Sequence, residues 1–94
     1  MRKYENIDNY YNNVVNNGIL VATTGGNWDF FAYNDILYSI PKAGTGAGAS
    51  IWCGLKSLRA HLYSLQSRLQ YNELIPPHWE IIDHAFFRAL GIIK

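Results

Sequence analysis

Large apolar side chains recur between residues 51 and 69 at intervals of four, three, four, three and four positions. These side chains are Ile51, Leu55, Leu58, Leu62, Leu65 and Leu69. A repeat of three and four residues places side chains on one side of an α-helix. The pattern therefore predicts a long helix that is capped by Ser50 at its N-terminus and that continues to about Tyr71.

The same spacing occurs near both ends of the chain. Residues 4–17 carry an apolar stripe made of Tyr4, Ile7, Tyr11 and Val14. Gly18 follows, where a helix-ending residue with a positive φ is expected. After Pro76-Pro77, residues 79–93 carry a second stripe made of Trp79, Ile82, Phe86, Ala89 and Ile93. Because proline is tolerated in the first turn of a helix, the two prolines are expected to open this third helix.

Between the first and second predicted helices, the pattern changes to one typical of strands. Residues 19–24, 28–33 and 36–40 are rich in β-branched and aromatic side chains, and Gly25-Gly26-Asn27 indicates a turn. Asn34-Asp35 separates the last two strands and suits a two-residue hairpin. That hairpin pairs Tyr33 with Ile36, Phe31 with Tyr38, and Asp29 with Ile40.

Both faces of this hairpin are apolar. One face carries Phe31, Tyr33, Ile36, Tyr38 and Ile40, and the other carries Trp28, Phe30, Ala32, Leu37 and Ser39. Three short helices cover one face well and the other only in part, so the remaining face is a candidate contact surface. We therefore predict a single α+β domain over residues 1–94, in the order α-β-β-β-α-α. Its three-stranded antiparallel meander packs against the second and third helices, with the first helix across an edge or the other face.

The amino-acid composition excludes several classes of function. The chain is 49% hydrophobic but only 16% charged, with a net charge of +1 and scattered lysines and arginines. Nucleic-acid binding through phosphates requires clustered positive charge, so direct nucleic-acid binding is not expected. A single cysteine, Cys53, allows no internal disulfide. No signal peptide or membrane span is expected, which favours a cytoplasmic location and no membrane partner.

A glycine-rich segment precedes the predicted long helix and is a candidate ligand site. Its expected ligand-binding residues are Gly44, Thr45, Gly46, Gly48 and Ser50. Backbone N–H groups at a helix N-terminus bind phosphate, helped by the helix dipole. The segment lacks the context of a dinucleotide fold and the Gly-Lys-Ser/Thr of a P-loop. It is more simply explained as a flexible loop, as small residues that let the helix approach the sheet, or as a loop that contacts a partner.

Aromatic and basic residues form a second stripe on the predicted long helix. The expected partner-binding residues are Trp52, Lys56, Arg59 and Tyr63, together with Trp28 and Phe30 of the sheet. Aromatic side chains interleaved with cations bind protein partners well. The alternative is that Trp52 and Tyr63 flank the core while the cations face water.

The potential catalytic groups do not form a recognisable site. Glu80 and His84 lie one helical turn apart in the predicted third helix, where a salt bridge between them explains the pattern better than catalysis. No spacing fits a zinc site, and Cys53 is interpreted as a small buried residue far from His61. We expect no catalytic residues, no metal and no cofactor, and hence no enzymatic activity.

These observations favour a non-enzymatic binding protein that blocks a surface on a larger macromolecule, either a protein or a ribonucleoprotein. Its small size, its usage of Asn, Ile, Tyr and Lys, and its high asparagine content suggest a phage or mobile-element inhibitor of a host defence factor, such as an anti-CRISPR protein, acting in the host cytoplasm. The alternative is a phosphate- or nucleotide-binding protein that uses the loop at residues 44–50. A third hypothesis is a homo-oligomer that buries its remaining apolar area between copies.

Overall fold

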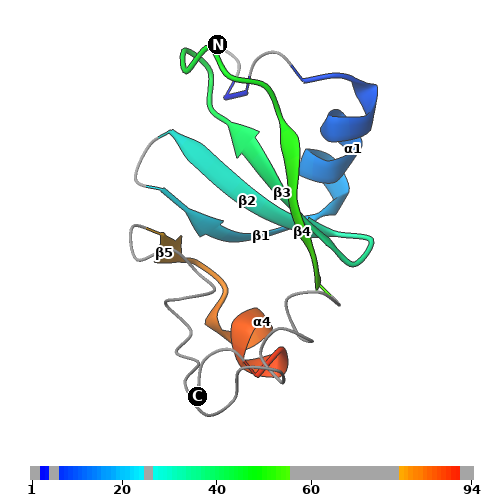
Figure 1. Ribbon diagram of the computed structural model, residues 1–94, viewed down its shortest axis with the longest axis vertical. Helices are drawn as coiled ribbons and strands as arrows, with labels where there is room; N and C mark the ends of the chain where they lie inside the picture. The colour runs from blue at the N-terminus through cyan, green and yellow to red at the C-terminus, as the bar shows by residue number, and fades with distance from the viewer. Residues whose placement is uncertain (1–2, 5–6, 25–26, 56–78, 92–94) are drawn as a thin grey trace.

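The computed structural model describes residues 3–4, 7–24, 27–55 and 79–91, which form a small α+β structure (Figure 1). A five-stranded antiparallel sheet has the strand order β4-β3-β2-β1-β5. The strands are β1 (Ile19–Thr23), β2 (Trp28–Tyr33), β3 (Ile36–Pro41), β4 (Ser50–Gly54) and β5 (Glu80–Ile81). Within these residues the helices are α1 (Asn9–Asn17) and α4 (His84–Ala89). The α+β class is thus confirmed, but the meander of three strands is extended by one strand on each side.

The central hairpin of β2 and β3 agrees with the prediction. Asn34 and Asp35 both have positive φ, 51° and 62°, as a tight two-residue hairpin turn requires. The strands pair Tyr33 with Ile36 and continue in that register to Trp28 and Pro41. The two-residue turn fixes this register, and the register decides which side chains share a face.

The prediction of a helix beginning after Ser50 is wrong. Residues Ser50–Gly54 form strand β4, which pairs with β3, and the backbone N–H of Leu55 donates to the carbonyl of Asp35. The sequence Ile51-Trp52-Cys53 suits a strand as well as a helix, and pairing with β3 favours the strand. The rest of the leucine stripe and Tyr71 lie outside the described residues.

The beginning of the third predicted helix is also corrected. Glu80–Ile81 is strand β5, paired with β1, and α4 begins only at His84. The Asp83 carboxylate accepts a hydrogen bond from the backbone N–H of Phe86 at 2.9 Å, so it caps the helix. Pro76-Pro77 lie outside the described residues. Glu80 and His84 therefore belong to different elements, and the predicted pairing of the two along one helix is wrong.

Helix α1 is shorter than predicted and ends differently. Asp8 caps it by accepting a hydrogen bond from the Tyr11 backbone N–H. Tyr4 lies before the helix and forms a bridge with Lys42, next to the end of β3. Gly18 is extended, with φ −81°, so the predicted positive φ is wrong. It is required for another reason, because a Cβ at this position would lie 2.5 Å from the Val14 carbonyl oxygen.

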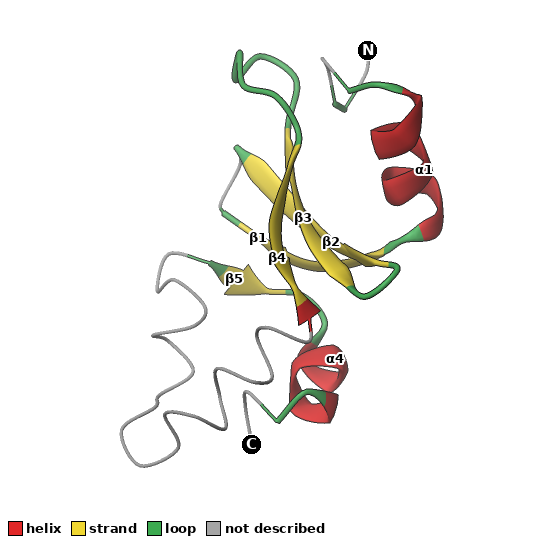
Figure 2. Ribbon diagram, turned by 45° about the vertical axis from the view of Figure 1, so that its right-hand side comes forward, coloured by secondary structure: helices red, strands yellow, loops and turns green. Residues whose placement is uncertain are grey.

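Apolar side chains cover both faces of the sheet. Helix α1 lies on one side of the sheet (Figure 2). The α1-side core contains the buried residues Val14, Phe31, Tyr38 and Ile40. The Trp79-side core contains Val21, Ala22, Phe30, Ala32, Leu37, Trp79, Phe87 and Leu90. The expected division of the hairpin into two faces is therefore confirmed. The expectation that one of those faces remains open at the hairpin is wrong, because the segments on both sides of the hairpin bury it.

Candidate binding surface at strand β4

Strand β4 contains an extra residue that turns Trp52 toward the Trp79-side core. Its pairing with β3 passes from Ile51 opposite Tyr38 to Cys53 opposite Leu37, which leaves Trp52 without an opposite residue. Such a β-bulge redirects a side chain and increases the local twist of a strand. As a consequence, Trp52 and Cys53 both lie on the face of Phe30 and Leu37, where Cys53 packs against the core.

Three aromatic rings meet at this face. Phe30 and Trp79 are stacked, with ring centroids 3.7 Å apart and planes at 28°. The ring of Trp52 lies beside both of them. Its centroid is 6.0 Å from that of Phe30, with the ring planes at 79°, and 5.2 Å from that of Trp79, with the planes at 57°. Phe30 is only 3% exposed and Trp79 is 8% exposed, whereas Trp52 is 48% exposed. Trp52 is thus supported from below by a buried aromatic pair while half of its surface faces outward.

This arrangement corrects part of the predicted partner-binding set. Phe30 is buried, so its side chain cannot be a direct contact, and Trp28 is half-buried against the same core. Trp52 is exposed as expected, but on a strand instead of a helix. The other predicted contacts, Lys56, Arg59 and Tyr63, lie outside the described residues.

Ile51 extends the exposed apolar surface around the edge of the sheet. It pairs with Tyr38 of the α1-side core and is 57% exposed. Ile51 and Trp52 thus bracket the outer edge of β4 on its two faces. In the sequence, residues 43–55 contain no charged side chain. The edge is therefore apolar and neutral, which is uncommon because edge strands usually carry charges or proline.

The glycine-rich segment is a loop between β3 and β4, so it does not precede a helix. Ser50 is the first residue of β4, and the ligand-binding alternative therefore loses the helix dipole on which it depended. Gly44 and Gly46 have positive φ, 91° and 76°, which explains the glycines by backbone conformation. A Cβ at Gly44, Gly46 or Gly48 would meet no atom within 4 Å. Close packing against the sheet therefore does not account for the loop's small residues.

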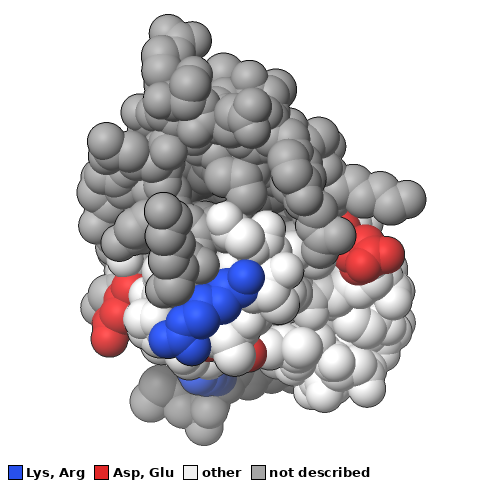
Figure 3. Space-filling model, turned by 90° about the horizontal axis from the view of Figure 1, so that it is seen from below, with Lys and Arg blue, Asp and Glu red and all other residues white. Residues whose placement is uncertain are grey.

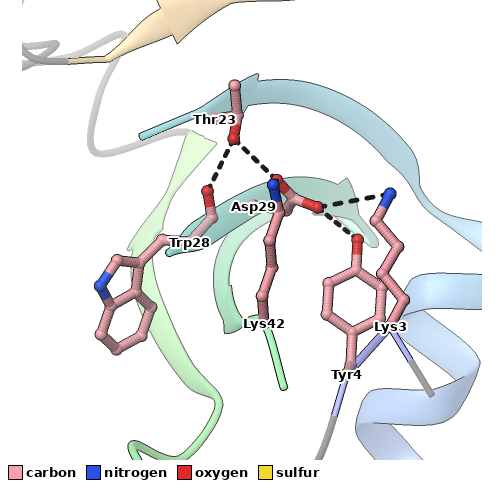
Figure 4. A network of polar contacts seen from close by, with 6 residues as sticks. All are labelled: Lys3, Tyr4, Thr23, Trp28, Asp29 and Lys42. Atoms are coloured by element: carbon pink, nitrogen blue, oxygen red, sulfur yellow. Dashed lines mark hydrogen bonds and ion pairs between the residues drawn. The ribbon is translucent and has the colours of Figure 1, made fainter. Parts of the chain in front are cut away.

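The sequence analysis missed a buried carboxylate, that of Asp29 (Figure 4). One oxygen accepts hydrogen bonds from the Tyr4 hydroxyl and the other from the Thr23 hydroxyl at 2.8 Å. The ammonium groups of Lys3 and Lys42 lie 3.7 and 3.6 Å from the same carboxylate. The available signal was an acidic residue within the apolar strand 28–33, on the face of Phe31.

The Asp29 contacts connect segments that are distant in sequence. Asp29 on β2 contacts Thr23 of the neighbouring strand, Lys42 after β3 and the N-terminal pair Lys3-Tyr4. Burial, reinforced by the hydrogen bond to the carboxylate, raises the pKa of Tyr4 well above its ordinary value. Because both carboxylate oxygens accept hydrogen bonds from other segments, the cluster holds the end of the sheet together.

The remaining chemistry in the described residues is sparse. Burial raises the pKa of Cys53, which makes its thiol a poorer nucleophile at neutral pH. In the described part of the chain, no three His, Cys, Asp or Glu residues gather as a metal site would require. On the face drawn in Figure 3, the described basic and acidic atoms occupy small areas among uncharged residues, and no large area of a single charge is visible there. His61 and His78 lie outside the described residues.

Comparison with known proteins adds no relative from which a function could be transferred. Within the described residues, no helix has the length and apolarity that crossing a membrane would need. No family model, no curated protein and no solved structure matches this chain.

Proposed function

We propose that this protein is a non-enzymatic binding protein that covers a surface on a larger macromolecule and makes contact through strand β4. The observation that carries this proposal is Trp52, which is half exposed while its inner side rests on the stacked Phe30 and Trp79. A tryptophan held in one orientation loses little conformational freedom on binding and presents a large contact area.

The chemistry of the surface favours a protein as the partner. Ile51 and Trp52 contribute apolar area, and residues 43–55 contribute no charge. Phosphate groups are bound by clustered lysine and arginine, whereas the core of a protein interface is depleted of charge and enriched in aromatic residues. The partner is therefore a protein, either alone or within a ribonucleoprotein. As a more specific form of the proposal, the partner is a host defence factor that the bound protein inhibits.

The proposal is tested with Trp52→Ala in an affinity capture from extracts of the source cells, followed by affinity measurement with the captured protein. Loss of a central interface tryptophan typically costs 2 kcal/mol or more, so affinity should fall by about 30-fold. Ile19→Ala is the matched control, because Ile19 is 52% exposed on β1 and far from β4 in strand order.

The control should leave affinity unchanged, and both variants should keep the circular dichroism spectrum of the parent protein. Equal affinities for the parent protein and Trp52→Ala would exclude Trp52 as the anchor and refute this form of the proposal.

A further inference from the structure

The two edges of the sheet differ in how they are protected. Strand β5 has only two residues, one of which is the exposed acid Glu80. Short length and charge are the usual means by which an edge strand avoids pairing with another chain. Strand β4 has five residues and neither charge nor proline, and in the described sheet only β3 lies beside it. Among the described residues, the bulge at Trp52 is the one feature of this edge that hinders pairing with another chain.

The outer edge of β4 also carries backbone groups that favour one kind of occupant. In an antiparallel sheet, the N–H and C=O groups of alternate residues point to opposite sides of a strand. About half of the groups of β4 therefore point away from β3. The backbone of another extended segment has hydrogen-bonding groups at the same spacing and can pair with these N–H and C=O groups. Apolar side chains of that segment would contact Ile51 on one face of the sheet and Trp52 on the other.

We propose that strand β4 binds an extended, uncharged segment of a partner protein as a sixth strand of the sheet. This inference rests on the proposed binding function and specifies its mode and the chemistry of the partner. Because residues 43–55 carry no charge, the matching segment is uncharged and rich in β-branched or aromatic residues. The segment pairs with β4 by backbone hydrogen bonds, and Trp52 covers one of its faces.

The size of the edge favours a peptide segment over a second copy of this chain. Five residues of strand span about 17 Å, and the exposed parts of Ile51 and Trp52 offer roughly 200 Å² of apolar area. A stable dimer buries about 800 Å² on each partner. The bulge also twists the edge, and a free segment follows that twist more easily than the edge of a second rigid sheet.

The test uses the intact protein and a displayed library of nine-residue peptides built from Val, Ile, Thr, Tyr, Phe and Ser. A matched library with Lys or Glu at every second position is the control. Binders are expected from the neutral library only, and their affinity should fall with Trp52→Ala but not with Ile19→Ala. If no neutral peptide binds, or if the charged library binds equally well, the inference is wrong.

Backbone pairing is then tested by placing a methyl group on each peptide nitrogen in turn. Because alternate N–H groups face β4, methylation at every second position should weaken binding about tenfold, and methylation at the positions between should have no effect. Each methyl group is on the peptide, so folding of the protein is not affected. A tolerance pattern without a period of two would refute strand addition.

The outcomes separate this inference from the proposed function. If Trp52→Ala weakens capture of the protein partner but the methylation pattern lacks the period of two, the binding function stands and strand addition fails. If the period of two appears but Trp52→Ala has no effect, strand addition stands and the tryptophan anchor fails. A concentration-dependent dimer in sedimentation that is abolished by Ile51→Lys would assign the edge to a second copy and overturn the inference.

Discussion

The hydroxyl of Tyr4 donates a hydrogen bond to the carboxylate of Asp29, 25 positions later in the chain. Through this contact the N-terminal segment is attached to the central strand of the sheet. The backbone N–H of Ala43 also donates to the carbonyl of Lys3, beside the bridge between Tyr4 and Lys42. The end of the sheet therefore depends on a carboxylate that is shared by several segments.

Replacing Asp29 should destabilise the fold. Asp29→Asn keeps the shape of the side chain but removes the charge that faces Lys3 and Lys42 and turns one acceptor into a donor. A buried, charge-assisted cluster of this kind should lose about 2–3 kcal/mol of unfolding free energy, measured by urea denaturation. Asp35→Asn is the matched control, since Asp35 is exposed and asparagine tolerates its positive φ. Equal stability of the two variants would contradict the role of Asp29.

Stability should decrease in alkaline solution because the half-buried Tyr4 and the buried Tyr38 resist ionisation. Burial first, and then hydrogen bonding, raises the pKa of Tyr4 well above its ordinary value and that of Tyr38 to about 12. In the unfolded chain both lose their protons near pH 10, so the unfolded state binds fewer protons above that pH. The stabilisation is complete below pH 10 and is lost as the pH rises through the folded pKa values.

Absorbance at the wavelength of tyrosinate should show these two residues ionising after the other tyrosines, while urea denaturation at increasing pH should show the loss of stability. Tyr4→Phe should remove its part of the late ionisation. If all tyrosines ionise together near pH 10 in the folded protein, the burial of these hydroxyls is refuted.

Two glycines should respond in opposite ways to alanine. At Gly18 the added Cβ would lie 2.5 Å from the Val14 carbonyl and 3.0 Å from the Ala32 carbonyl, both of them backbone atoms. Gly18→Ala should therefore cost about 1–3 kcal/mol of unfolding free energy. Gly48→Ala should be neutral or stabilising by about 0.5 kcal/mol, because its Cβ meets nothing and its φ is not positive. Thermal denaturation of both variants shows whether glycine is required only where a backbone carbonyl lies too close for a Cβ, as at Gly18, or at both positions.

The hairpin turn should be improved by glycine at its second position. Asp35 has φ 62°, a conformation that costs little for glycine and more for other residues. Asp35→Gly should raise the unfolding free energy by about 0.5–1 kcal/mol, and Asp35→Val should lower it. Urea denaturation of both variants checks the turn, and a stabilising valine would show that the turn type is different.

Elements that are decided by neighbouring residues could be predicted from the sequence, whereas elements that are decided by pairing with a distant strand could not. The β2–β3 hairpin is specified locally, since Asn34-Asp35 selects the turn and the turn selects the register. Strand β4 is decided by pairing with β3, and a spacing of four between Ile51 and Leu55 cannot reveal that pairing. Strand β5 depends in the same way on β1.

In the candidate site, too, the features that depend on distant segments could not be predicted from the sequence. The sequence predicts Trp52 as a contact because it belongs to an aromatic and basic stripe on an expected helix. The structure places Trp52 on the surface, but on strand β4. Its support by Phe30 and Trp79 could not be predicted, because it requires the bulge in β4 and the return of residue 79 to the sheet. The Asp29 cluster was equally hidden, because its members come from four separate segments.

The difference between the two edges of the sheet limits how many of its edges can take up a partner segment. A protein whose sheet has two open edges can join copies of itself without limit and grow into a fibre, whereas one with a single open edge can pair with another chain on one side only. In the described sheet, the two-residue β5 with its exposed Glu80 would stop propagation on its side. A strand added at β4 would therefore extend the sheet on that side alone, and each copy of this chain would offer one edge to a partner segment.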